Sequence, residues 1–327
     1  MPAPLFLRQT TSWGGRGVFA TQPIPSGTLV HTCPIPYASV IYREFRKEVC
    51  AQCFAYAFDA RKNAWNVRAA GLWFCTEGCR DVWMSAEPVA LIMEVNAAID
   101  KVARSLKTKG ERTVLIPKES LSQDALDAAW ESAEHTDVAL DELELETVRF
   151  VLSALIRRHT EQDTEPVPGN TWADALELQD NELPCTQSRP FILASHLRVY
   201  AFIRRVARLV PVLAPYITSV RPILARDPGN VFGIYEMNET GDSEMFGWSM
   251  YVSASFFNHD CRPNIRKQRA GRSICFYTTR DVALGEELCT SYVDLENGVQ
   301  ERRAQLASNW YFDCVCERCK TETERRL

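Results

Sequence analysis

The cysteines constrain the folding of this chain more than any other feature, because seven of the twelve occur in close groups. The first group consists of two pairs, Cys50-x2-Cys53 and Cys75-x3-Cys79, separated by 21 residues. Two close pairs of thiolates suit a tetrahedral Zn²⁺, which takes four soft ligands from two turns. The alternative is that CAQC is a reduced pair and CTEGC the start of a helix. The spacing favours the metal site.

The second group is CVCERC, which places Cys314, Cys316 and Cys319 within six residues near the C-terminus. Three thiolates leave a tetrahedral zinc one ligand short, so a fourth must come from elsewhere. Cys261, in the turn NHDCRPN, is the natural candidate, and it would fix the C-terminal segment to that turn. The isolated cysteines are predicted to be small core residues: Cys33, Cys185, Cys275 and Cys289.

The composition predicts an ordinary globular protein, with 46% hydrophobic and 24% charged residues in a chain of 327. The net charge of −5 argues against bulk attraction to nucleic acid, so direct nucleic-acid binding is not expected. The local basic run at 266–272 is interpreted as a solvated strand edge. We see no secretory signal, and the apolar stretch 209–220 contains two prolines, so no membrane span is expected. These observations predict a monomer in the nucleus, the cytoplasm or both.

The order of patterns along the chain predicts an α+β fold. Glycine-punctuated β-type runs occupy the first 40 residues, and strand patterns return after Gly229 at 231–237, 248–254, 273–280 and 287–293. Between them lie the cysteine module and a long helical region, with amphipathic segments at 88–110, 122–134 and 143–159. Because separated β halves usually pair into one unit, residues near 17 and 258 are expected to meet. We predict these segments: 1–45, 46–84 (zinc module), 85–227 (helical insertion), 228–296 and 297–327 (second zinc segment).

Four motifs resemble, in order and spacing, those of SET-domain protein-lysine methyltransferases. They are GRGVFA (15–20), NHDCRPN (258–264), GEELCTSYV (285–293) and CVCERC (314–319). The module at 50–79 resembles the MYND zinc finger of the SET-and-MYND subgroup. The resemblance covers most of the chain apart from the helical region. It implies a β-rich SET domain split by a zinc module and a helical insertion, and closed by a post-SET zinc site.

The resemblance also implies roles for individual residues. It implies that S-adenosylmethionine binds in a pocket and that a substrate lysine, from a histone or another protein, enters through a narrow aromatic channel. The expected cofactor-binding residues are Arg16, Gly17, Asn238, Ser255, Asn258, His259, Tyr292 and Phe312. The expected channel residues are Tyr292, Trp310 and Phe312, with Tyr292 catalytic. The expected zinc ligands, in two structural sites, are Cys50, Cys53, Cys75, Cys79, Cys261, Cys314, Cys316 and Cys319.

These roles agree with the chemistry of methyl transfer. Transfer from a sulfonium to an amine is an in-line displacement, so the protein mainly aligns the reactants and keeps the amine neutral. An apolar channel beside a positive sulfonium disfavours the ammonium form. Tyr292 would therefore orient the amine without acting as a strong base, and His259 would have a positional role.

Three departures qualify the resemblance. The module keeps the residues for one zinc, whereas a full MYND finger has two sites, so a structural role is expected. The sequence ends soon after CVCERC, so the C-terminal helical domain of several SET-and-MYND proteins is not expected. Asn238 is followed by Glu239 and Thr240, whereas the family has a small residue and then Phe. The alternative to an enzyme is a catalytically silent SET and MYND-type scaffold for protein interaction, which would not need to keep Asn258, His259 and Tyr292 together.

Overall fold

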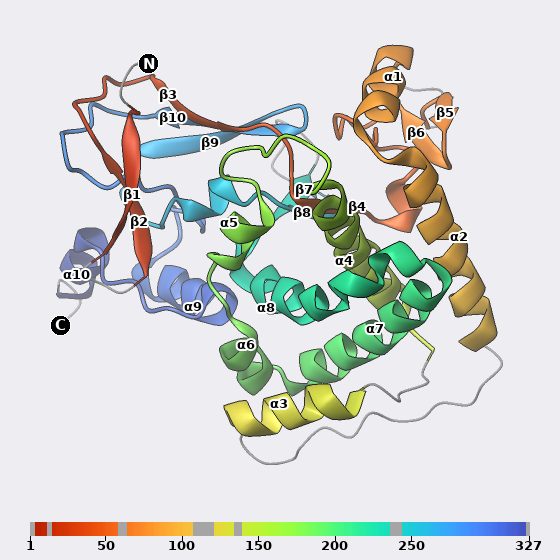
Figure 1. The fold of residues 1–327 in the computed structure, drawn as a ribbon. Coiled ribbons are helices and arrows are strands. Elements are labelled where there is room, and N and C mark those ends of the chain that lie inside the picture. The colour runs from red at the N-terminus through yellow and green to blue at the C-terminus, as the bar shows by residue number, and fades with distance from the viewer. Residues whose placement is uncertain are drawn as a thin grey trace.

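We analysed a computed structural model, which describes residues 4–11, 15–57, 64–106, 121–133, 139–235 and 244–324. Strands β1 to β3, β9 and β10 lie on one side of the molecule and β4, β7 and β8 near its centre, while β5 and β6 lie beside α1 at the opposite side, next to α2 (Figure 1). The strands are β1 Phe6–Thr10, β2 Arg16–Ala20, β3 Leu29–Cys33, β4 Ala38–Ile41, β5 Val67–Ala69, β6 Leu72–Phe74, β7 Val231–Tyr235, β8 Met245–Met250, β9 Ile265–Ala270 and β10 Ser273–Thr278. The mixed α+β prediction is confirmed.

The helical elements fill the predicted middle region and the C-terminal end. They are η1 Arg43–Phe45, α1 Glu77–Ala86, α2 Val89–Leu106, α3 Gln123–Ser132, α4 Glu142–Thr160, α5 Trp172–Leu176, α6 Glu182–Ser188, α7 Pro190–Leu209, η3 Pro211–Ser219, α8 Val220–Asn230, η4 Ser253–Phe256, α9 Val299–Trp310 and α10 Glu317–Glu324. Side-chain caps set several starts. Asp141 and Glu144 form a capping box on α4, and Ser122 caps α3 by accepting from the Ala125 N–H.

The sheets join residues from opposite ends of the chain. Their strand orders are β1-β2, β3-β10-β9, β4-β8-β7 and β5-β6. β3 pairs with β10 and β4 with β8, both antiparallel, so the N-terminal strands pair with strands more than 200 residues later. The predicted union of the two β halves is therefore confirmed.

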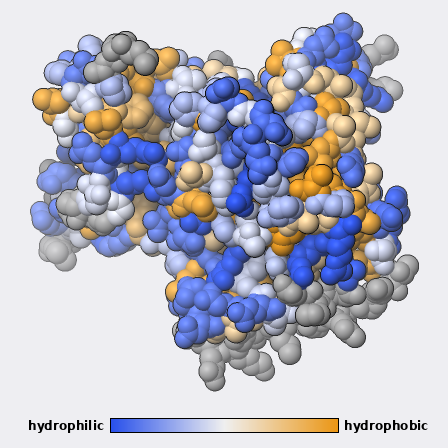
Figure 2. All heavy atoms as spheres, viewed as in Figure 1, coloured by the Kyte–Doolittle hydropathy of each residue, from blue (hydrophilic) through white to orange (hydrophobic). Residues whose placement is uncertain are grey.

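The main core lies where the helices cover these sheets. α4 packs on β4, and α7 packs on α2, α4 and η3. Fully buried side chains such as Phe150, Phe202 and Phe276 belong to this one cluster. On the face shown in Figure 2, the surface is mostly hydrophilic, with an apolar band between α2 and α4. No single described helix is long and apolar enough to cross a membrane, although α1 and α2, bent by 90°, pass that test as a pair.

Two predicted strands differ from the observed structure. The run 248–254 leaves the sheet after Met250 and turns into η4, where the Ser255 N–H bonds back to Tyr251 O. The run 287–293 forms only isolated bridges at Glu287 and Thr290. Its backbone pairs first with β2 and then with the loop at His259, so it forms no continuous strand pairing with either segment. β-type residues identified an extended segment here, and tertiary contacts decided its partners.

Candidate active site and metal centres

The site is built around the extended segment 286–292, which passes between β2 and the loop 258–264. The Leu288 N–H donates to Val18 O at 2.7 Å, and the Thr290 N–H donates to Asn258 O at 2.9 Å. In return, the Ile265 N–H donates to Cys289 O at 3.2 Å. The motifs that stand far apart in the sequence therefore meet at this segment.

The side-chain amide of Asn258 connects its own loop, 258–264, to β2 and to the segment 286–292. Its Nδ2 donates to Arg16 O at 2.7 Å and to Glu287 Oε1 at 2.8 Å. Burial raises the pKa of the half-buried Glu287 carboxyl, and the bond from Asn258 opposes this rise. Both amide hydrogens are thus used within the protein, leaving Oδ1 as the free end. Glu287 was missed from the sequence, although it lies inside the quoted motif GEELCTSYV.

Gly17 leaves room for the close approach of this carboxylate. A Cβ at position 17 would lie 2.2 Å from Glu287 Oε1 and 2.9 Å from the Thr11 methyl carbon. Real Cβ contacts do not reach such distances, so only glycine fits without displacement. The predicted cofactor residue Gly17 therefore has a packing reason in the structure.

His259 and Tyr292 hold each other in place. The Tyr292 N–H donates to His259 Nδ1 at 3.1 Å, so Nδ1 is the unprotonated nitrogen, and Nε2 faces Cys261 Sγ at 3.2 Å. Burial lowers the pKa of His259 to about 4. Because both ring nitrogens are occupied, His259 can meet a cofactor only through its backbone or ring face.

The Tyr292 side chain is fixed at its other end as well. Its hydroxyl donates to Phe257 O at 2.8 Å, and burial raises the pKa of Tyr292 above its ordinary value. The hydroxyl therefore stays protonated at neutral pH. The ring centroid of Trp310 lies 5.3 Å away and that of His259 5.4 Å away.

The predicted channel residues come together in this aromatic group. Phe312 lies at its rim, 37% exposed, with its ring 6.2 Å from His259. Trp310 ends α9 against the turn at Gly229, where an added Cβ would lie 3.4 Å from Trp310 Cδ1. Tyr292, Trp310 and Phe312 thus form one aromatic surface next to the Asn258 loop.

The two predicted polar contacts, Ser255 and Asn238, have different outcomes. Ser255 lies beside β7, and its hydroxyl donates to Asn230 O at 3.0 Å. Asn238 lies outside the described residues. Asn230 is buried at the end of α8, directly before β7, and is followed by Val231 and Phe232. That order resembles the expected asparagine, small residue and Phe, with Val in the middle position.

The surroundings of Arg16 fit a zwitterionic ligand. Within the described residues, its Nε is enclosed without a hydrogen-bond partner, and its guanidinium stacks on Phe256 at 4.6 Å. Burial lowers the pKa of Arg16. An enclosed cationic donor fits the carboxylate end of a zwitterionic group, such as the methionine part of S-adenosylmethionine.

Both predicted cysteine clusters form. In each, four Sγ atoms lie within 4.8 Å of one another. Three Sγ pairs are close: Cys53 to Cys75 at 3.6 Å, Cys75 to Cys79 at 3.5 Å and Cys261 to Cys319 at 3.5 Å. Tetrahedral zinc with bonds of about 2.3 Å places its sulfurs roughly 3.8 Å apart. The thiols fit two zinc sites.

The alternative interpretation of the first cluster, in which CTEGC begins a helix, is compatible with metal binding. CTEGC does begin a helix, because Thr76 caps α1 by accepting from the Cys79 N–H at 3.1 Å. Cys75 and Cys79 nevertheless point toward the CAQC turn. Phe74 and Trp83 pack below the cluster and attach it to α2. The module is therefore a helix start and a metal site at once.

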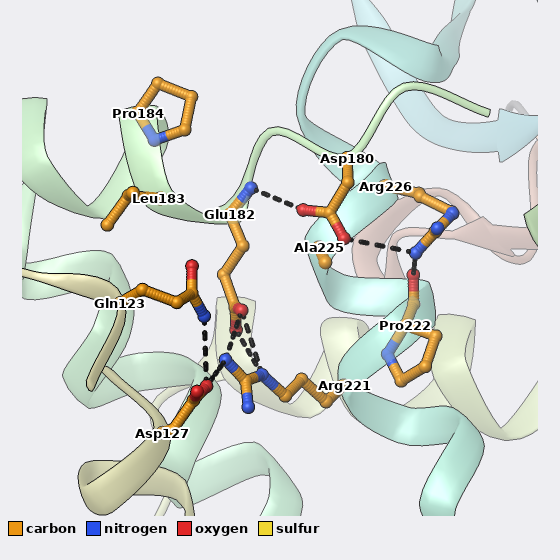
Figure 3. A pocket seen from close by; sticks show the side chains of 10 residues that line it. All are labelled: Gln123, Asp127, Asp180, Glu182, Leu183, Pro184, Arg221, Pro222, Ala225 and Arg226. Carbon is orange, nitrogen blue, oxygen red and sulfur yellow. Dashed lines mark hydrogen bonds and ion pairs between the residues drawn. The ribbon is translucent and has the colours of Figure 1, made fainter. Parts of the chain in front are cut away.

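A separate pocket of about 390 Å³ lies among α3, α6 and α8, away from these residues (Figure 3). Arg221 spans it and pairs with Glu182 and Asp127, both also in the lining, while Arg226 pairs with Asp180. Every charged side chain in the lining forms an ion pair with another one there. These contacts fasten the helices together, so we assign no cofactor to this pocket.

Comparison with known proteins decides the family. A SET domain sequence profile matches residues 15–293. The chain belongs to the SET-domain family. The SET match spans both β halves and the helical region between them, including Gly17, Asn258 and Tyr292.

Relatives of this SET protein include methyltransferases and MYND proteins. The potential protein lysine methyltransferase SET6 of Saccharomyces cerevisiae is 30% identical over 98% of this chain and 96% of its own length. A SET and MYND domain-containing protein of Dictyostelium discoideum is 33% identical over 32% of this chain and 26% of its own. The histone-lysine N-methyltransferase SET5 of Yarrowia lipolytica is 41% identical over 24% and 18%. The last two matches are local.

Proposed function

We propose that this SET-domain protein transfers a methyl group from S-adenosylmethionine to the side-chain amine of a lysine in a protein substrate. The observation that carries the proposal is the setting of Tyr292, enclosed by His259 and Trp310 and fixed at both its amide and its hydroxyl. The names of the yeast relatives, a potential protein lysine methyltransferase and a histone-lysine N-methyltransferase, support this activity.

When bound, S-adenosylmethionine supplies a methyl group on a sulfonium that a neutral amine can attack. The role of the chain is to align that amine and to keep it unprotonated. The Tyr292 hydroxyl donates its hydrogen to Phe257 O, so its oxygen lone pairs stay free to accept an N–H of the incoming amine. The rings of Trp310 and Phe312 exclude water from the same place and disfavour an ammonium ion.

We assign the cofactor to the surface that joins Arg16, Gly17, the Ser255 region and the Asn258–His259 loop. The unsatisfied Arg16 Nε and the Glu287 carboxylate support this placement. Asn238 stays a prediction, and we propose Asn230, whose backbone carbonyl accepts from the Ser255 hydroxyl, as a second candidate for the asparagine role. The predicted segment boundaries also stay predictions.

The cellular setting is a further part of the proposal. We propose that the protein works in the nucleus, the cytoplasm or both, as a monomer and without direct nucleic-acid binding. The unpaired state of all twelve cysteines supports a reducing compartment.

The direct test is incubation of the zinc-loaded protein with a labelled cofactor and a mixture of cellular proteins, followed by mass spectrometry of modified lysines. Calorimetry with S-adenosylmethionine measures cofactor binding separately. We expect both binding and lysine-specific label. Absence of transfer together with absence of binding would contradict the proposal, while binding without transfer to any protein would favour the silent scaffold.

A further inference from the structure

Arg302 is the largest fully buried side chain in the described parts of the protein, and the proposed reaction does not use it. It lies in α9, 0% exposed. Buried arginines require partners, and this one has four. Its Nε donates to Cys261 Sγ at 3.4 Å, and its NH2 nitrogen donates to Cys319 Sγ at 3.8 Å and to Glu322 at 2.7 Å. Its NH1 nitrogen donates to Asn297 O at 2.5 Å.

The guanidinium therefore contacts two thiols of the C-terminal cluster. Four thiolates around one Zn²⁺ carry a net charge of −2, which is costly to bury without compensation. A cationic N–H donor draws electron density from sulfur and lowers its reactivity while the metal stays bound. The second donor on Cys261 is His259, whose Nε2 lies 3.2 Å from the same sulfur. Cys261 is thus contacted by two side-chain donors besides the other cysteines.

The first cluster differs from the C-terminal cluster in its side-chain donors and in its burial. Across the described part of the chain, no side-chain nitrogen donates to Cys50, Cys53, Cys75 or Cys79, whose sulfurs meet each other. Three of these four residues are only partly buried, whereas three of the four C-terminal ligands are buried. The two sites share a ligand set and differ in the groups around it.

We propose that Arg302 and His259 form an outer shell of N–H donors that makes the C-terminal site the slow-exchanging and weakly reactive one. The first site has backbone N–H donors but, among the described residues, no such side-chain donors, and it is where zinc leaves first and where electrophiles react first. In that reaction a thiolate sulfur attacks the carbon of an alkylating reagent, the carbon–halide bond breaks, halide leaves and the released zinc passes to a chelator. This inference concerns the metal sites alone and does not depend on methyl transfer.

The test uses the full-length zinc-loaded protein with iodoacetamide and a chromogenic zinc chelator. Samples quenched over time are digested, and mass spectrometry follows each cysteine separately. We expect the cysteines of the first site to be alkylated on the order of tenfold faster than those of the second, in step with release of the first zinc. This comparison lies within one wild-type molecule, so it does not depend on any variant folding. Equal rates, or a faster second site, would overturn the proposal.

Variants distinguish protection of the cysteines by the outer-shell donors from protection by burial alone. Arg302→Met should speed alkylation of Cys261 and Cys319 on the order of tenfold and leave the first site unchanged. Arg302→Lys, which keeps the charge and an N–H donor, should restore part of the protection. The matched control is Arg303→Met on the same helix, whose guanidinium pairs with the exposed Asp313. Equal effects of the substitutions at 302 and 303 would show that the contacts to sulfur carry no protection.

Discussion

Replacing Gly17 with alanine tests the close packing at the centre of the site. The new Cβ would lie 2.2 Å from Glu287 Oε1 and 2.9 Å from the carboxyl carbon. Restoring ordinary carbon–oxygen contact requires the carboxylate to move by about 1 Å or more. Such a shift breaks the 2.8 Å bond from Asn258 Nδ2, which also holds Arg16 O.

The expected cost combines overpacking with the loss of one hydrogen bond to a charged group. Overpacking typically costs about 1–3 kcal/mol, and the hydrogen bond contributes about 1.5–3 kcal/mol. We therefore expect Gly17→Ala to lower the free energy of unfolding by about 2.5–6 kcal/mol. It should also weaken cofactor binding, because Arg16 and Asn258 move with the carboxylate.

Urea unfolding of four proteins in a double-mutant cycle measures this cost. Glu287→Ala removes the obstructing carboxylate, so Gly17→Ala in that background should cost less by about 2 kcal/mol. Gly27→Ala is the control, because its Cβ meets nothing within 4 Å although its φ is +79°, and strain alone should cost about 1 kcal/mol. If the effects at 17 and 287 add within about 0.5 kcal/mol, Glu287 is not the obstacle and the reasoning fails.

Three further predictions use other parts of the protein. Tyr292→Phe should reduce turnover by about 10- to 100-fold, because a positioned hydroxyl is lost. The affinity for S-adenosylmethionine, measured by calorimetry, should stay nearly unchanged. A large loss of that affinity would indicate a packing role for Tyr292 instead. Cys261→Ser should lower the zinc content measured by metal analysis by one ion per chain, whereas Cys185→Ser should leave it unchanged. Equal zinc contents in these two variants would remove Cys261 from the ligand set. Burial lowers the pKa of His196 to about 4, so between about pH 6.5 and 4 the unfolded chain binds a proton that the folded chain does not. Burial of His196 should therefore lower the free energy of unfolding by roughly 2 kcal/mol as the pH falls from 7 to 5. Urea titrations of His196→Leu should lack this decrease of about 2 kcal/mol. The same pH dependence in both proteins would contradict the lowered pKa of His196.

The metal sites could be predicted from the sequence because ligand chemistry is local and strict. Four thiolates must converge within a few ångströms, and few arrangements of Cys50 to Cys79 allow this. Helix limits were predictable for a similar reason. The segment predicted at 122–134 is α3, capped at Ser122, and the one predicted at 143–159 is α4.

The remainder depended on contacts between distant residues. Nothing in 287–293 says that its backbone pairs with two segments in turn. Glu287 and Arg302 look like ordinary charged residues until the fold encloses them against Asn258 and Cys261. Asn230 is the last residue of α8, and only the fold brings its backbone carbonyl to the Ser255 hydroxyl.

The passage of segment 286–292 between β2 and the loop 258–264 has a consequence for how the chain matures during synthesis. β2 emerges from the ribosome about 270 residues before its partner, so its binding surface stays incomplete for roughly 15–50 s at ordinary translation rates. The helices between them contact one another and can pack first. The site around Tyr292 is therefore completed late, once segment 286–292 and Trp310 at the end of α9 have been synthesised. A nascent chain stalled before residue 286 should bind no cofactor.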